Sequence, residues 1–287
     1  MRARFKMIRY GDHNYGDIKT TLKEIPGHFG VRSIEPGEED YSLHTDHSPN
    51  WDDHKLQILT NPVLDRHRLP VLRDCKPDGT PRLWTGRPWV DQFLKFITVL
   101  VDGYRHPRVI EIHPPFKKDC PDMPSFLALY QVFEEQIGRA FPGAQVLLEH
   151  RNGGFLVEDP SDIVRLVKVM DHSFRLRFVL DVPQVITRLR KRKLGSVSPA
   201  AVMAKLEELS QFKKMIRSVH ISGKGHGGDL DSLFGSSADL DTFLKKLSDW
   251  FDDGQVRYMV PEANGVRQTD FSAMCKKLRN YFEFQDS

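Results

Sequence analysis

The chain has 287 residues, of which 39% are hydrophobic and 28% charged, and its formal net charge is +3. These values are typical of an ordinary soluble globular protein, and the small positive excess permits a polyanionic partner without demanding one. No apolar stretch approaches the ~20 residues that a membrane-spanning helix needs. The basic N-terminus is not followed by an apolar signal core, so we expect a cytoplasmic protein without a membrane partner.

The first hundred residues contain the less regular predicted elements. Short apolar runs predict strands at 6–10, 31–36 and 69–74. Residues 41–66 are rich in His, Asp, Asn and Trp, and we expect them to be irregular. Apolar side chains spaced three and four residues apart predict a helix over 88–104.

From residue 108 onwards, predicted strands and helices alternate regularly. Apolar runs predict strands at 108–113, 144–149, 176–181, 216–221 and 256–262. The segments between them have helical spacing of apolar residues, and two helices begin with a capping residue followed by proline, at Asp159-Pro160 and Ser198-Pro199. Near-continuous apolar strands alternating with amphipathic helices indicate a parallel sheet covered by helices.

The eight predicted strands favour a closed barrel. The sequence has no Gly-x-Gly-x-x-Gly turn after its first predicted strand, where a dinucleotide-binding fold has one. Its length suits one α/β barrel, which typically has about 250 residues. We therefore expect a single TIM-barrel domain, (β/α)8, over residues 1–287, with its active site at the C-terminal ends of the strands.

Potential metal ligands stand at the C-terminal ends of five predicted strands. They are His113, Glu149, Asp181, His220 and Glu262. Any one of them alone is more often a capping or hydrogen-bonded residue, but strand ends in a barrel converge on one face. Together they indicate a shared site for one to three divalent ions, with zinc expected first and manganese or iron as alternatives.

Two further segments are expected beside this face. The glycine-rich loop after His220 contains His226 and Asp229, which are further candidate ligands. The basic run RLRKRK, which follows Asp181, contains Arg188, Arg190 and Lys191. This run is either a solvated surface or a rim that contacts phosphate groups.

The pattern resembles the xylose isomerase-like barrel superfamily, which includes abasic-site nucleases of the endonuclease IV class and many sugar isomerases and epimerases. The matching segments are RVIEIHPP, LLEHRNG, LDVPQ, SVHISGKG and VPEANG. The resemblance implies that the Glu, Asp, His and Glu of the last four segments bind a metal. It also implies that His113, His226 and Asp229 extend the site as in the nucleases.

Two departures from the superfamily pattern favour a smaller metal site. Gln184 stands where a histidine is usual, and an amide oxygen is a poor zinc ligand. No histidine ends the predicted strand at 69–74, although His44 and His47 precede it. A site with one or two metal ions is therefore predicted more safely than one with three.

Three functions remain open. The first expectation is a metal-dependent hydrolase resembling an endonuclease IV-type abasic-site nuclease, in which metal-activated water attacks a phosphodiester of DNA. Its substrate would contact Gln184, Arg188, Arg190, Lys191 and Asn264. The alternative is a sugar isomerase or epimerase in which Glu149 and Glu262 act as acid and base. The third is a non-catalytic barrel subunit of a larger complex.

Overall fold

The computed structural model describes residues 2–7, 9–10, 41–47, 57–59, 84, 90, 91, 94, 98, 106–193, 196–262 and 268–285. The first four strands are β1 (Arg4–Met7), β2 (Arg9–Tyr10), β3 (Tyr41–His47) and β4 (Gln57–Leu59). The predicted strands at 31–36 and 69–74, and most of the predicted helix 88–104, lie outside the described residues.

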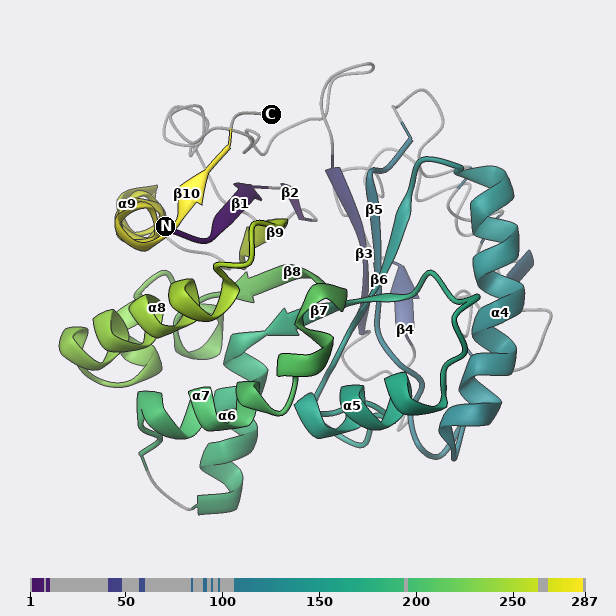
Figure 1. The fold of residues 1–287 in the computed structure, drawn as a ribbon, viewed down its shortest axis with the longest axis horizontal. Helices are drawn as coiled ribbons and strands as arrows, with labels where there is room; N and C mark the ends of the chain where they lie inside the picture. The colour runs from purple at the N-terminus through teal and green to yellow at the C-terminus, as the bar shows by residue number, and fades with distance from the viewer. Residues whose placement is uncertain are drawn as a thin grey trace.

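From residue 109 strands and helices alternate as predicted, except that two α-helices follow the strand that ends at Asp181 (Figure 1). The strands are β5 (Val109–Ile112), β6 (Gln145–Glu149), β7 (Arg177–Asp181), β8 (Ile216–Ile221), β9 (Val256–Pro261) and β10 (Glu283–Phe284). The α-helices are α4 (Met123–Ala140), α5 (Pro160–Val169), α6 (Val182–Lys193), α7 (Pro199–Glu207), α8 (Ser237–Phe251) and α9 (Gln268–Tyr281). Short 3-10 helices are η1 (Ser210–Met215), η2 (Lys224–His226) and η3 (Leu230–Leu233).

The parallel strands form a sheet that closes on itself. The strand order is β10-β1-β9-β8-β7-β6-β5-β3-β2. Strand β1 pairs in parallel with β9, and β2 pairs in parallel with β3, while only Ile8 separates β1 from β2 in the chain. The N-terminal segment therefore joins the two ends of the sheet, and the described part of the chain confirms the predicted α/β barrel.

One prediction for the N-terminal third is wrong. Part of the segment 41–66, expected to be irregular, forms β3, which pairs in parallel with β5, and β4, which pairs antiparallel with β3. The sequence of β3, YSLHTDH, has few apolar residues and no clear alternation. Pairing with its neighbours in the closed sheet overrides this weak local preference.

The helix starts follow the predicted capping pattern. Asp159 accepts a hydrogen bond from the backbone N–H of Ser161 at 2.9 Å, and Pro160 is the first residue of α5. Ser198 caps α7 in the same way, with Pro199 behind it. Each cap binds backbone N–H groups that the helix itself leaves unpaired.

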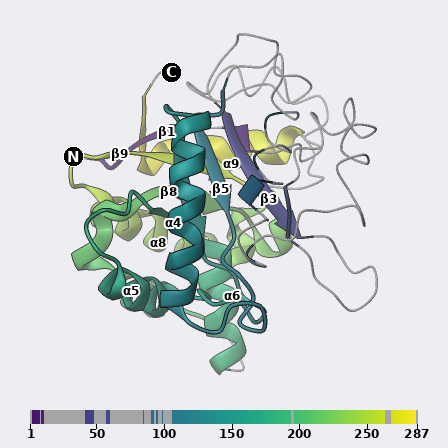
Figure 2. The ribbon, with the colours of Figure 1, turned by 90° about the vertical axis from the view of Figure 1, so that its right-hand side faces the viewer.

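Two faces of the strands pack differently. Outward residues such as Ile110 join the main hydrophobic core with helix residues such as Phe126 and Phe133 of α4, which stands along the outside of the sheet (Figures 1 and 2). The inward residues Val109, Leu147, Val179 and Val260 form a small separate apolar layer that fills the barrel. Among the described residues, no helix is long and apolar enough to cross a membrane.

Candidate metal centre

A layer of polar side chains lies directly above the apolar layer inside the barrel. Side chains alternate along a strand, so residues two positions after the four apolar ones face the same interior. These residues, with the histidine of β8, are Glu111, Glu149, Asp181, His220 and Glu262. Each is 4% exposed or less. Four buried carboxylates cannot all be ionised so close together unless a cation or bound protons compensate their charge.

The donor atoms of this layer form two groups that share His220. One group is Glu111, Glu149 and His220, and the other is Asp181, His220 and Glu262. Within each group the donor atoms lie within 4.8 Å of one another. The predicted residues Glu149, Asp181, His220 and Glu262 thus come together, and their carboxylate and imidazole groups are positioned to hold a divalent metal.

The two nitrogens of His220 have different surroundings. Nε2 lies 2.9 Å from Oε2 of Glu111, which is hydrogen-bonding distance. Nδ1 lies 3.5 Å from Oε2 of Glu149 and 3.7 Å from Oε2 of Glu262. Two donors at about 2.1 Å from one zinc ion would lie roughly 3–3.5 Å apart. The Nδ1 side of the ring therefore has the spacing of a metal site.

The surroundings of Asp181 favour a bound cation. Burial raises the pKa of Asp181 well above the ordinary value, and the nearby carboxylates of Glu149 and Glu262 raise it further. Its Oδ1 accepts a hydrogen bond from the backbone N–H of Gln184 at 3.0 Å. Its buried Oδ2 has no hydrogen-bond partner among the described residues. A divalent ion would satisfy that oxygen, so the residues present fit a bound metal.

His113 lies beside the donor groups but belongs to neither. Its Nε2 is 3.5 Å from Oε2 of Glu149 and 3.3 Å from Nη1 of Arg151. A guanidinium group only donates hydrogen bonds, so Arg151 occupies the lone pair that a metal would need. The indole Nε1 of Trp84 also donates to the backbone carbonyl of His113 at 3.0 Å, which fixes this part of the chain.

The loop after β8 places its predicted ligands differently. Asp229 is exposed, and its Oδ1 accepts a hydrogen bond from the backbone N–H of Asp231 at 3.0 Å, so it caps η3. It enters neither donor group. The side chains of His226, His44 and His47, and all of Asn264, lie outside the described residues.

Most arginines of the basic run form ion pairs or hydrogen bonds with other residues of the protein. The run lies on α6, which begins directly after Asp181. Arg188 pairs with Glu158 at 2.9 Å and Arg192 with Asp159 at 3.1 Å. Arg190 donates to the carbonyl of Leu233. Of the three residues in this run that were predicted to contact substrate, only Lys191 is exposed, so the run mainly joins α6 to its neighbours.

Gln184 fixes the loop that follows β6. Its side-chain oxygen accepts hydrogen bonds from Asn152, from the backbone N at 3.2 Å and from Nδ2 at 2.8 Å. Further along this loop, Gly153 and Gly154 have φ of +112° and +95°, and their N–H groups donate to Glu158. The loop that carries Arg151 is therefore held at both ends.

Sequence reasoning missed Glu111 and Arg151. For Glu111 a signal did exist, because it alternates with Val109 and His113 on the same strand. His113 ends the apolar run and is itself a potential ligand, so it was predicted in place of Glu111. Nothing in the sequence marks Arg151 apart from its position two residues after Glu149.

Removing one of the ion pairs should cost stability. Arg188→Ala is expected to lower the free energy of unfolding by about 1–2 kcal/mol, between the values for exposed and buried pairs. Arg188 is 29% exposed and its partner Glu158 only 6%, and Glu158 would keep Lys117 at 3.2 Å. Urea denaturation measures the change, and Lys191→Ala on the same helix is the control. Equal stabilities of the two variants would contradict a structural role for Arg188.

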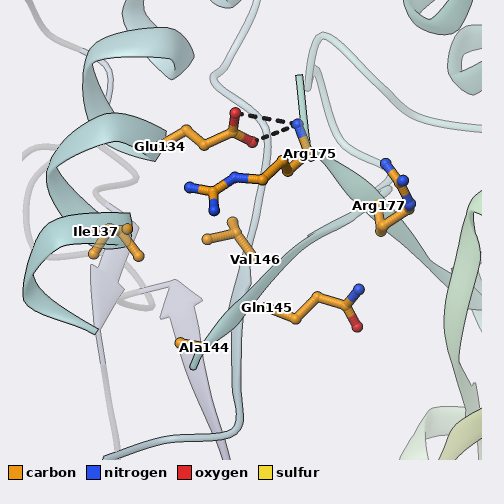
Figure 3. A pocket seen from close by; sticks show the side chains of 8 residues that line it. Glu134, Ile137, Ala144, Gln145, Val146, Arg175 and Arg177 are labelled. Carbon is orange, nitrogen blue, oxygen red and sulfur yellow. Dashed lines mark hydrogen bonds between the residues drawn. The ribbon is translucent and has the colours of Figure 1, made fainter. Parts of the chain in front are cut away.

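A pocket of about 280 Å³ lies at the other end of the barrel (Figure 3). It is lined in part by Gln145 and Arg177, which begin β6 and β7. Glu134 at its edge accepts two hydrogen bonds from the backbone N of Arg175, at 2.9 and 3.1 Å. The described residues of its lining include one acid, Glu134, and no histidine, so the metal ligands and this pocket are separate features.

Comparisons with known proteins give similarities of fold only. No family model and no curated protein matches the sequence. A D-tagatose 3-epimerase-like protein is 15% identical over 97% of this chain and 88% of its own, with a TM-score of 0.48. An L-ribulose 3-epimerase is 14% identical over 98% and 92%, with a TM-score of 0.46. The IOLI protein with a zinc atom is 15% identical over 68% and 71%, with a TM-score of 0.44.

The prediction of an endonuclease IV-type DNA nuclease is wrong, and with it the hydrolase class, DNA repair and DNA as a partner. None of the solved structures named above is described as a nuclease, and two are described as an epimerase or as epimerase-like. The residues that favoured a DNA-binding site make contacts within the protein. Arg188 and Arg192 form ion pairs, and His113 faces Arg151. The fold itself is the α/β barrel implied by the resemblance to the xylose isomerase-like superfamily.

Proposed function

We propose that the protein is a metal-dependent isomerase or epimerase acting on a small sugar. The observation that carries this proposal is the arrangement of two buried glutamates around one imidazole nitrogen. Nδ1 of His220 lies 3.5 Å from Glu149 and 3.7 Å from Glu262. Asp181 forms one donor group with His220 and Glu262, and Glu149 belongs to the second group, which shares His220.

This donor set suits a single divalent ion. Carboxylate-rich sites favour manganese or magnesium, whereas a mixture with imidazole also suits zinc. When bound, the ion would polarise a carbonyl and its neighbouring hydroxyl, which makes the adjacent C–H more acidic. The position of Arg151 at Nε2 of His113 supports one ion over a multinuclear centre.

The two glutamates have the placement that acid–base chemistry on a sugar requires. They come from the ends of β6 and β9, with Asp181 and His220 on the two strands between them. Each carboxylate has two oxygens, so one can face the ion and the other a substrate carbon. An epimerase needs a base on each face of the carbon, and an isomerase moves a proton between adjacent carbons.

Arg151 is the proposed contact to substrate oxygens. Its guanidinium lies beside His113, and the loop that carries it is fixed by Gln184 and Glu158. A rigidly held guanidinium can donate two hydrogen bonds to one substrate without further ordering. The sugar would then lie between this loop and the donor set.

Proton exchange with solvent tests the proposed reaction. The metal-loaded protein would be incubated in D2O with a panel of aldoses and ketoses and followed by NMR. We expect deuterium at one carbon next to the carbonyl, together with the new isomer or epimer, and loss of both with a chelator. A protein that binds metal but exchanges no proton of any small sugar would instead support the non-catalytic subunit.

A further inference from the structure

We infer that Glu111 is a positioning residue that sets the tautomer of His220 and so directs Nδ1 of that ring to the metal. The inference rests on the proposed metal centre. It assigns a role to a buried carboxylate that is not needed as a ligand or as an acid–base group.

The contact between these residues is short and fully enclosed. Oε2 of Glu111 lies 2.9 Å from Nε2 of His220, and both side chains are 0% exposed. Glu111 is on β5 and His220 on β8, so the bond crosses the interior of the barrel. Packed barrel walls on both sides leave neither ring nor carboxylate an easy alternative rotamer.

The chemistry of the two groups fixes the direction of the hydrogen bond. An ionised carboxylate only accepts hydrogen bonds, whereas a neutral imidazole carries one N–H and one lone pair. With a metal bound, the ring would be neutral, and Nε2 would carry the hydrogen and donate it to Glu111. The lone pair is then on Nδ1, the nitrogen that faces Glu149 and Glu262.

The distance of 2.9 Å is that of a direct hydrogen bond, and a nitrogen that donates its hydrogen to Glu111 has no lone pair left for an ion. The metal would therefore lie on the Nδ1 side. A carboxylate that accepts the distal N–H of a metal-bound histidine fixes the ring and makes it a stronger donor, and losing such a partner typically lowers metal affinity about 10–100-fold.

Glu111→Gln, with Glu134→Gln as a matched control, tests this role. Glu134 is on α4 outside the barrel, so its variant makes the same chemical change away from the metal (Figure 3). Zinc affinity would be measured by competition with a chelator. We expect Glu111→Gln to bind zinc about 10–100-fold more weakly and Glu134→Gln to bind as the unaltered protein does.

Nitrogen-15 NMR of the zinc-loaded, unaltered protein provides a second readout that needs no variant. We expect His220 to keep its hydrogen on Nε2 while Nδ1 is shifted by the metal. Zinc bound through Nε2, or an unchanged affinity in Glu111→Gln, would overturn the inference. Tight zinc binding without sugar conversion would overturn the proposed function and leave Glu111 in its role. A protein that binds no divalent ion would overturn both.

Discussion

Replacing Glu149 or Glu262 by glutamine is expected to abolish sugar conversion while leaving the barrel folded. General acid–base groups contribute about 10²–10⁴-fold to a rate, and each glutamate would also lose its charge as a ligand. We therefore expect kcat to fall about 10³-fold or more. Both side chains are buried beside other carboxyl groups, so removing one negative charge should raise the melting temperature of the metal-free protein.

The two variants should differ from each other in isotope exchange. If the glutamates serve opposite faces of one carbon, each variant keeps one base and still exchanges the proton of one epimer. The measurement is deuterium incorporation from D2O into each epimer separately, with Glu134→Gln as the control. Normal turnover in both glutamate variants would exclude them as the acid and base.

The barrel and four of its five central donors could be predicted because the chain alternates so regularly after residue 108. The strand predicted at 216–221 has the same bounds as β8, since an apolar run in a buried parallel strand is a strong local signal. The glutamates, the aspartate and the histidine that end such runs were visible for the same reason. These features depend on neighbouring residues only.

The contact of Glu111 with His220 and the strand β3 could not be predicted in this way because they depend on pairing between distant parts of the chain. Glu111 contacts His220, which lies 109 residues later in the sequence. The stagger of neighbouring strands in the closed barrel places both side chains in the same layer. His113 directly follows β5 and meets Arg151. Likewise β3 is a strand because β5 pairs with it. The ion pairs of the basic run could not be predicted because its acidic partners, Glu158 and Asp159, belong to a different β/α unit.

The metal-free protein is expected to become less stable as the pH rises, and a bound metal to reverse this loss. Burial, together with Glu149 and Glu262, raises the pKa of Asp181 well above 3.8. Burial alone would lower the pKa of His220, but Glu111 and Glu149 raise it well above 6.5. In both cases the folded protein holds a proton that the unfolded chain releases. The stability from each proton is complete below the ordinary pKa and is lost as the pH rises through the raised one.

Melting temperatures measured between pH 5 and 8, with chelator and with excess zinc, test this linkage. Metal binding displaces these protons and supplies the missing positive charge, so zinc should bind more tightly as the pH rises. At a hundred times its Kd, a ligand stabilises the folded state by about 2.7 kcal/mol. For a chain of this size that corresponds to roughly 5–10 °C. A gap between the zinc-loaded and metal-free melting temperatures that narrows with rising pH would mean that Asp181 and His220 do not bind the ion.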